Sequence, residues 1–188
     1  MHKKLWEASE IVKNASNLFK YEKFLFNKFN YNPSKNFIKL LDWSINNPKE
    51  FWSSIWDFCR VKGNKNYKFK ISKNLIQNKY LVNSKVNFAE NLLSMNSNSK
   101  AITFISENGY KKVRTWKELK INTFKIIDFF KKIKIQENDR VAAYLPNYIE
   151  TVECFLATSS LGAIWSSCSP DFGVNGVIER FSQIKPKL

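Results

Sequence analysis

The sequence is poor in the residues on which several kinds of active site depend. It has five glycines and one histidine among 188 residues. It contains neither a Gly-x-x-x-x-Gly-Lys segment nor a loop rich in Gly, Ser and Thr, so no phosphate-binding loop is expected in this chain. The histidine, His2, stands at the start of the chain, which argues against histidine acid–base catalysis. The Gly-x-Ser-x-Gly elbow of serine hydrolases is also missing from the sequence.

Cysteine is equally scarce. Cys59, Cys154 and Cys168 are too few and too far apart for a disulfide framework or a Cys-x-x-Cys metal site. They fit a reducing compartment, and Cys154 and Cys168 are predicted to be small buried apolar residues. We therefore predict no metal site in this chain.

Long apolar stretches are absent as well. No apolar run approaches the ~20 residues that a membrane-spanning helix needs. The N-terminus carries charges at Lys3, Lys4, Glu7 and Glu10 and lacks the apolar core of a secretory signal. The sequence predicts a cytoplasmic protein that does not associate with membranes.

Acidic residues are outnumbered, with 16 Asp and Glu against 31 Lys and Arg, a formal net charge of +15. Such a charge is typical of nucleic-acid-binding proteins. However, 27 of the basic residues are lysine and four are arginine, the residue that binds phosphate with two parallel hydrogen bonds. Lys, Asn, Ile, Phe and Tyr share A/T-rich codons, so we attribute the charge to genome composition and predict no nucleic-acid partner. The alternative, a non-catalytic basic nucleic-acid-binding module, would show strongly salt-dependent binding.

Residues 1–98 are predicted to form a mainly helical N-terminal region. Apolar residues recur at helical spacing from Phe37, and Asn47-Pro48 is typical of a helix start. Residues 60–86 are interpreted as an irregular surface segment, residues 87–93 as a short capped helix, and residues 94–99 as a polar linker. The helix after Asn47 is expected to bury a stripe made of Phe51, Trp52, Ile55, Trp56 and Cys59.

Residues 99–188 show clearer periodicity. Strands are predicted over 101–105 and 110–114, joined by a hairpin turn at Asn108-Gly109. Thr115-x-x-Glu118 is a capping box that opens a long helix. The buried face of that helix is expected to consist of Trp116, Leu119, Phe124, Ile127 and Phe130.

A parallel β-α-β unit follows. The apolar run 141–145 predicts a strand buried on both faces, and 163–167 predicts its parallel neighbour. Asn147 is expected to cap the intervening helix, with Glu150 at its third position, and Gly162 to end it. A further helix begins near Val174 and should be followed by another strand at residues 186–188. Its predicted sheet-facing residues are Val174, Val177, Ile178, Phe181 and Ile184. The fold class is therefore α/β, with the beginning of a parallel sheet that we expect to be truncated.

Several segments resemble a known family. D-R-V-A-A-Y-L-P-N at 139–147 resembles the strand and turn of adenylate-forming acyl-CoA synthetases. L-G-A-I-W-S-S-C-S-P-D-F-G-V at 161–174 and R-F-S-Q-I-K-P-K-L at 180–188 resemble the acetoacetyl-CoA synthetase family in particular. N-F-A-E-N-L-L at 87–93 is similar to a segment of the same enzymes. The resemblance spans nearly the whole chain and is weakest over 60–86.

The resemblance implies an activity. Such enzymes use ATP and magnesium to convert acetoacetate to an acyl-adenylate, and coenzyme A then displaces AMP. Residues 1–98 would be the helical N-terminal region and 99–188 an incomplete start of the AMP-binding domain. The phosphate loop, the adenine and ribose contacts and the catalytic lysine would lie beyond Leu188, so no catalytic residue is expected here and the isolated chain should be inactive. Another short-chain acyl-CoA synthetase remains an alternative, because most of the acid-binding pocket would also lie downstream.

The candidate binding residues are Ser169, Pro170, Asp171 and Phe172. They follow the carboxyl end of a parallel strand and precede a helix, where α/β folds place ligands. The resemblance implies that the corresponding turn lies near the coenzyme A nucleotide, although Phe172 alone matches the family's pattern there. The alternative is a structural turn in which Asp171 caps backbone amides. Glu150 and Glu153 are interpreted as complements of a helix dipole, not as an acid–base pair.

Overall fold

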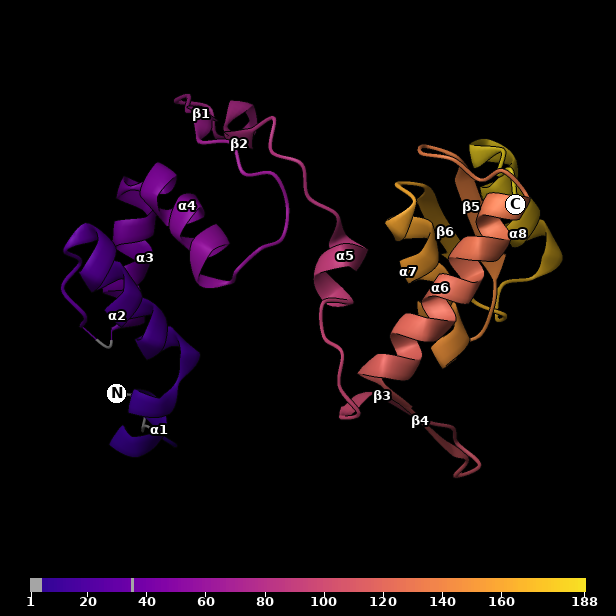
Figure 1. Cartoon of the computed structure of the whole chain (residues 1–188), viewed down its shortest axis with the longest axis horizontal. Coiled ribbons are helices and arrows are strands. Elements are labelled where there is room, and N and C mark those ends of the chain that lie inside the picture. Colours follow the sequence, from indigo (N-terminus) through magenta and orange to yellow (C-terminus); the bar gives the residue numbers. More distant parts are fainter. Residues whose placement is uncertain (1–4, 35) are drawn as a thin grey trace. The chain divides into compact units, whose positions relative to one another are not determined.

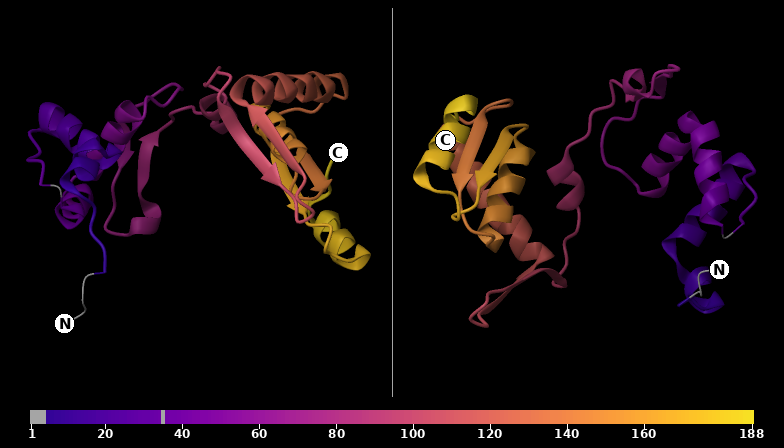
Figure 2. Two further views of the ribbon diagram at one scale, coloured as in Figure 1. Left: turned by 90° about the horizontal axis from the view of Figure 1, so that it is seen from below. Right: turned by 180° about the vertical axis from the view of Figure 1, so that it is seen from behind.

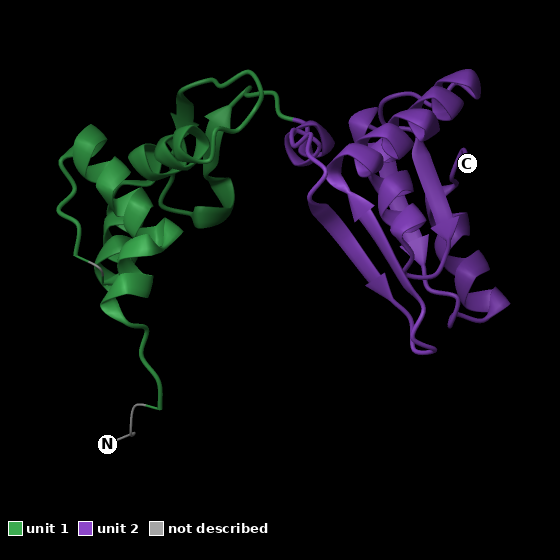
Figure 3. Cartoon of the chain, turned by 60° about the horizontal axis from the view of Figure 1, so that its bottom comes forward, with its two compact units in different colours: residues 1–86 green, residues 87–188 purple. Residues whose placement is uncertain are grey.

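The structure, a computed structural model, describes residues 5–34 and 36–188, which divide into two compact units (Figure 3). The first unit runs to residue 86 and the second covers residues 87–188. The division precedes the predicted boundary after residue 98, because helix α5 (Phe88–Leu92) belongs to the second unit. Ala89 of α5 and the following Leu93 are buried there against Leu119 and Leu156.

The first unit begins with four helices (Figure 1): α1 (Glu10–Ala15), α2 (Asn17–Phe29), α3 (Phe37–Asn46) and α4 (Pro48–Phe58). The predicted helices after Phe37 and after Asn47 are confirmed, and Pro48 takes the first position of α4, where its missing N–H is tolerated. The core of this unit contains Tyr21, Leu25, Tyr31 and Leu40. A helical N-terminal region is thus present as expected.

Helix α4 differs from the prediction in its cap and its buried face. Asn47 does not cap α4 with its side chain; its Nδ2 donates to the Trp43 carbonyl of the preceding helix at 2.9 Å. Phe51 and Ile55 pack on the core, but Trp52 and Cys59 are exposed. The fully buried positions are small, Ser53 and Ser54, and the Ser54 hydroxyl bonds the Tyr21 hydroxyl at 2.6 Å. This polar contact lets α2 and α4 approach closely, which an apolar-stripe argument does not anticipate.

Residues 60–86 are more ordered than predicted. Strands β1 (Lys68–Lys70) and β2 (Lys79–Val82) pair antiparallel, and the 3-10 helix η1 (Leu75–Gln77) lies between them. The interpretation as an irregular segment is therefore wrong for these residues. Strands of three and four residues, with lysine at their ends, are too short to show a reliable alternation of apolar and polar residues.

The second unit opens with the predicted hairpin, formed by β3 (Lys100–Ile105) and β4 (Lys111–Thr115). Within its turn the Gly109 N–H donates to the Ser106 carbonyl at 3.0 Å. The Ser106 N–H in turn donates to the Tyr110 carbonyl at 2.9 Å. Gly109 has φ +82°, the left-handed conformation that closes such a turn and that glycine adopts without strain.

Helix α6 (Trp116–Lys132) begins at the predicted capping box. The Glu118 N–H donates to Thr115 Oγ1 at 3.2 Å, and Glu118 Oε2 accepts from the Thr115 N–H at 2.8 Å. Leu119, Ile127 and Phe130 are buried as expected, but Phe124 is 49% exposed. Thr123 takes the buried position instead, since its hydroxyl is satisfied by the Leu119 carbonyl at 2.8 Å. The predicted face was therefore wrong by one position at its centre.

Replacing Thr115 with alanine is expected to lower the free energy of unfolding of the second unit by ~1 kcal/mol, because it removes an N-cap acceptor. Asn147→Ala is the matched control, since Asn147 is exposed and does not occupy the N-cap of its helix. Urea unfolding followed by circular dichroism measures both variants. Equal losses in the two variants would contradict this assignment of the caps.

The parallel β-α-β unit consists of β5 (Arg140–Tyr144), α7 (Ile149–Ser160) and β6 (Ile164–Cys168). Gly162, with φ +69°, ends α7 as predicted. Helices α6 and α7 cover one face of the strand pair. Their shared core contains Ile127, Phe130, Ile135, Val141 and Ala157, with Trp165 packed against it. The α/β fold class is confirmed.

Strand β5 is not buried on both faces, which corrects the prediction. Val141 and Ala143 are buried, whereas Arg140 and Tyr144 are exposed, so burial alternates along the strand. The predicted Asn147 cap is also wrong, because Tyr148 takes the N-cap position of α7. Ile149 starts the helix with only 2% of its surface exposed, so packing fixes where the helix begins.

Helix α8 (Val174–Ile184) lies on the side of the strands opposite α7 (Figures 1 and 2). Val177, Phe181 and Ile184 are half-buried, but Val174 and Ile178 are exposed, which corrects part of the predicted face. After α8 the chain returns to β5, but the structure assigns no strand to residues 185–188. The Lys187 N–H donates to the Arg140 carbonyl at 2.8 Å, and the Ala142 N–H donates to the Leu188 carbonyl at 2.7 Å. Because the residue numbers on both sides rise together, this segment runs parallel to β5.

The three cysteines differ in their exposure. Cys59 is exposed, Cys154 is half-buried and Cys168 is buried. Burial raises the pKa of the Cys154 thiol, and the nearby Glu153 and Glu150 carboxylates raise it further. The prediction that Cys168 is a buried apolar residue is confirmed, and Cys154 is only partly covered.

Candidate functional site

The candidate residues Ser169, Pro170, Asp171 and Phe172 form the connection from β6 to α8, at the carboxyl end of the parallel strands. All four are exposed. The Phe172 N–H donates to the Ser169 carbonyl at 3.1 Å, which closes a tight turn. The structure therefore places the sequence-predicted residues together, at the edge where α/β sheets bind ligands.

Asp171 stabilises this turn but does not cap the following helix. The Ser169 hydroxyl donates to Asp171 Oδ2 at 2.7 Å, and the Asp171 N–H points to Ser169 Oγ at 3.4 Å. Gly173 occupies the N-cap position of α8. In the alternative interpretation, a structural turn, Asp171 was expected to cap backbone amides; its carboxylate instead accepts from the Ser169 hydroxyl within the loop.

Tyr144 anchors the loop from the neighbouring strand. Its hydroxyl lies 2.8 Å from the Pro170 carbonyl and 3.1 Å from the Phe172 carbonyl, and it donates its hydrogen between these two acceptors. Tyr144 is the last residue of β5, so the side chain reaches across the carboxyl edge of the strand pair. Sequence reasoning did not assign Tyr144 a role, although it lies in the conspicuous segment 139–147.

Arg180 of α8 adds a positive charge beside the loop. Its guanidinium carbon lies 4.2 Å from the centre of the Phe172 ring, and Nη1 donates to the Gly176 carbonyl at 3.1 Å. Stacking on the ring holds the guanidinium in a defined orientation while the side chain stays exposed. The site therefore combines an aromatic ring, an oriented guanidinium and a tight turn. The helical position of Arg180, one turn after Gly176, is the sequence signal that was missed.

Glu150 and Glu153 do more than complement a helix dipole. Glu150 accepts from Lys112, and Glu153 Oε1 accepts from Arg114 Nε at 2.8 Å and from Asn122 Nδ2 at 2.9 Å. These bonds tie α7 to β4 and α6. The hydrogen bond to Glu153 raises the pKa of Arg114, while the burial of Arg114 itself lowers that pKa. Both carboxylates are held as ion pairs, which supports the expectation that they are not an acid–base pair.

Acid should weaken the second unit through Glu150. The hydrogen bond from Lys112 holds the pKa of the Glu150 carboxyl below its ordinary value of 4.5. A carboxyl whose pKa is lower in the folded chain stabilises the fold above that ordinary value, and its contribution is lost as the pH falls. We expect the free energy of unfolding of Glu150→Gln to fall less than that of the parent between about pH 5 and pH 3. Urea titrations across this range, with the exposed Glu179→Gln as control, measure the difference; parallel profiles for parent and Glu150→Gln would contradict it.

Within residues 5–34 and 36–188, no cluster of three His, Cys, Asp or Glu side chains is arranged to hold a metal ion. In the same ranges, no helix is both long enough and apolar enough to span a bilayer.

The loop beside Arg180 is suited to a phosphate-bearing ligand, because an oriented guanidinium binds phosphate oxygens.

Comparisons with known proteins show which enzymes the chain resembles. No family model matches the chain. Acetoacetyl-CoA synthetase of Xenopus tropicalis is 42% identical over 158 residues, which cover 81% of this chain and 24% of that protein. Malonamoyl-CoA synthetase of Penicillium aethiopicum is 33% identical over 155 residues, which cover 78% of this chain and 21% of that protein. The solved structure of acetoacetyl-CoA synthetase from Streptomyces lividans matches with a TM-score of 0.89 at 22% identity, over 98% of this chain and 29% of that one.

The fold is therefore that of a part of an adenylate-forming enzyme. Within that class, the chain is similar to acetoacetyl-CoA synthetases and spans about one quarter of their length. The family resemblance predicted from residues 87–93, 139–147 and 161–188 is confirmed.

Proposed function

We propose that this chain forms the N-terminal part of an acid–thiol ligase that activates acetoacetate with ATP and transfers the acyl group to coenzyme A. The supporting observation is the 42% identity to acetoacetyl-CoA synthetase over 158 residues. A carboxylate is a poor electrophile, and its mixed anhydride with AMP supplies a good leaving group. Magnesium and preorganised donors stabilise the charge of phosphate groups in such reactions. The cytoplasm is the proposed compartment, in keeping with the exposed free thiol of Cys59.

The part that this chain plays is structural and coenzyme-binding. Because the chain spans 24% of its Xenopus relative, we assign adenylation to segments outside these 188 residues. We expect the chain alone to show no acetoacetate-dependent exchange of pyrophosphate into ATP. A chimera in which it replaces the matching segment of the Xenopus enzyme should show exchange. Exchange by the chain alone, or a folded chimera without exchange, would refute the proposal.

Acid specificity is the second question, because the Penicillium relative is named for malonamate. We propose that this segment does not determine which acid the enzyme prefers. Chimeras on the Xenopus and Penicillium enzymes should then each prefer the acid of the enzyme that supplies the remainder. A chimera that changes its preferred acid would show that residues in this chain select the substrate.

We further propose that the loop of Ser169, Pro170, Asp171 and Phe172 lies beside the coenzyme A nucleotide, with Arg180 facing a phosphate. Arg180→Ala in the chimera should raise the KM for coenzyme A about 10- to 150-fold, since charged hydrogen bonds contribute ~1.5–3 kcal/mol. Exchange of pyrophosphate, which needs no coenzyme A, should stay unchanged. Gln183→Ala on the exposed part of the same helix is the control. An unchanged KM for coenzyme A in Arg180→Ala would rule out this placement.

A further inference from the structure

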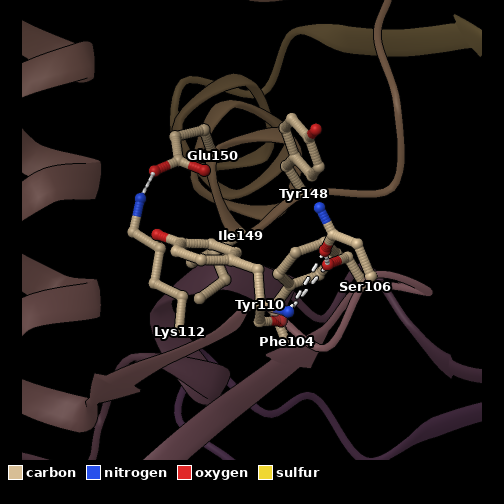
Figure 4. A pocket seen from close by; sticks show the side chains of 8 residues that line it. Phe104, Ser106, Tyr110, Lys112, Tyr148, Ile149 and Glu150 are labelled. Atoms are coloured by element: carbon tan, nitrogen blue, oxygen red, sulfur yellow. Dashed lines mark hydrogen bonds and ion pairs between the residues drawn. The ribbon is translucent and has the colours of Figure 1, made fainter.

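A cleft separate from the β6–α8 loop lies between the β3–β4 hairpin and the start of α7 (Figure 4). Its volume is about 280 Å³, near the lower limit of ligand pockets, which suits a small molecule. Strand β3, the hairpin turn, strand β4 and helix α7 all contribute to it. The lining residues are Phe104, Ser106, Asn108, Tyr110, Lys112, Tyr148, Ile149 and Glu150.

Strand geometry explains why these side chains meet. Alternate residues of a strand point to the same face, so Tyr110 and Lys112 share one face with the next alternate residue, Arg114. Phe104 lies directly opposite Lys112 in the antiparallel register. Arg114 and Lys112 are ion-paired with α7, which shows that this face is turned toward that helix.

Aromatic rings form the walls. The rings of Phe104 and Tyr148 are nearly perpendicular, with centroids 5.1 Å apart, and Tyr110 lies 6.3 Å from Phe104. Ile149 is buried at 2% exposure, while Tyr110 and Tyr148 leave 56% and 51% of their surfaces exposed. Two tyrosine rings thus remain available beside an apolar residue, an arrangement that favours a flat apolar ligand.

The charges of the cleft are already paired. The Lys112 ammonium bonds the Glu150 carboxylate, and Arg114 Nη2 lies 3.4 Å from the same oxygen. An organic cation would meet these two positive side chains, and an anion would have to displace Glu150. The cleft is therefore better suited to an uncharged ligand than to either kind of ion.

Polar groups at the hairpin turn can form hydrogen bonds with the edge of such a ligand. Asn108 Oδ1 accepts from the Ser106 hydroxyl and, at 3.1 Å, from the Tyr110 N–H. The side-chain oxygen of Asn108 is therefore used as an acceptor, and its N–H₂ group is the part of the amide that can donate to a ligand. The hydroxyls of Tyr110 and Tyr148 each add a group that can donate and accept.

We propose that this cleft binds an uncharged, planar heteroaromatic molecule of purine size. Its ring stacks on Tyr148 and Tyr110, and ring nitrogens accept from Asn108. The ligand class follows from three observations: exposed aromatic faces, internally neutralised charge and an amide held at the edge. The site is independent of the proposed coenzyme loop, with which it shares no residue.

Binding of adenine to the 188-residue chain, followed by saturation-transfer NMR, tests the proposal. Adenine should bind saturably, and Tyr148→Leu should weaken binding ~5- to 150-fold, the range measured when a stacking aromatic is removed. Tyr148→Phe, which keeps the ring, should retain most of the affinity. Asn108→Ala should weaken binding by a smaller factor.

The controls separate this cleft from other sites. Tyr67→Leu removes an exposed tyrosine of the first unit and should leave adenine binding unchanged. Benzoate and tetramethylammonium, an anion and a cation, should bind more weakly than adenine. Lack of saturable adenine binding, tighter binding of either ion, or equal affinity in Tyr148→Leu and the parent would overturn the proposal.

Discussion

Glu153→Ala is expected to lower the free energy of unfolding of the second unit by about 3–5 kcal/mol, the loss typical of a buried ion pair deprived of one partner. Glu153 is 3% exposed and accepts from both Arg114 and Asn122. Without it, a guanidinium with 19% side-chain exposure keeps its charge but loses its buried acceptor. Arg114 then keeps only the longer contact of 3.4 Å to Glu150, which is why the loss should exceed that of an exposed ion pair.

Native-state hydrogen exchange is the appropriate measurement, because it reports each unit separately. Amides in α6 and α7 should lose protection in Glu153→Ala, and those in α2 and α4 should not. Glu179→Ala, at an exposed position of α8, is the matched control. Replacing Arg114 and Glu153 together with leucine should restore part of the loss, since no charge is then left buried without a partner. A double variant as unstable as the sum of its single variants would contradict this explanation.

Leu156→Ala should be as damaging for a different reason. Leu156 has no exposed surface and packs against Ala89, Leu93 and Leu119, which join α5, α6 and α7. Truncating a fully buried leucine typically lowers the free energy of unfolding by about 2–5 kcal/mol, through lost burial and the cavity left behind. The same exchange experiment should show protection lost across all three helices.

Val174→Ala provides the comparison for Leu156→Ala. Val174 is 74% exposed at the start of α8, so its truncation should change the free energy of unfolding by no more than about 0.5 kcal/mol. If Leu156→Ala and Val174→Ala had similar effects, the core assigned to α5, α6 and α7 would be wrong.

Features encoded by neighbouring residues were predictable from the sequence. The capping box of Thr115 and Glu118, the turn at Gly109 and the helix end at Gly162 each depend on bonds or backbone angles within a few residues. The parallel β-α-β unit followed from short apolar segments separated by one helix. In all these cases, local preference and tertiary packing favour the same conformation.

Features set by contacts between distant residues were not predictable from the sequence. Asn147 was the predicted N-cap of α7, but burial of Ile149 places Tyr148 at that position. Thr123 displaces Phe124 from the buried face of α6 because its hydroxyl finds an acceptor within the helix. Composition and residue spacing predict neither the N-cap of α7 nor the buried residue of α6.

The candidate site divides in the same way. The place of residues 169–172 at the end of a strand could be predicted from element order. The hydrogen bond from Tyr144 to Pro170 joins residues 26 positions apart, and it exists only once the two strands pair. The aromatic cleft likewise brings residues 104–112 to residues 148–150. The periodicity within either segment cannot predict that the two segments lie side by side.

The unequal burial of the cysteines makes the chain suitable for selective labelling. Thiolates react with maleimides, and Cys59 is the exposed thiol, whereas burial slows Cys168 and a raised pKa disfavours the Cys154 thiolate at neutral pH. A fluorophore added at neutral pH should therefore attach mainly at the end of α4. Its emission would follow the melting of the first unit without any substitution in the sequence.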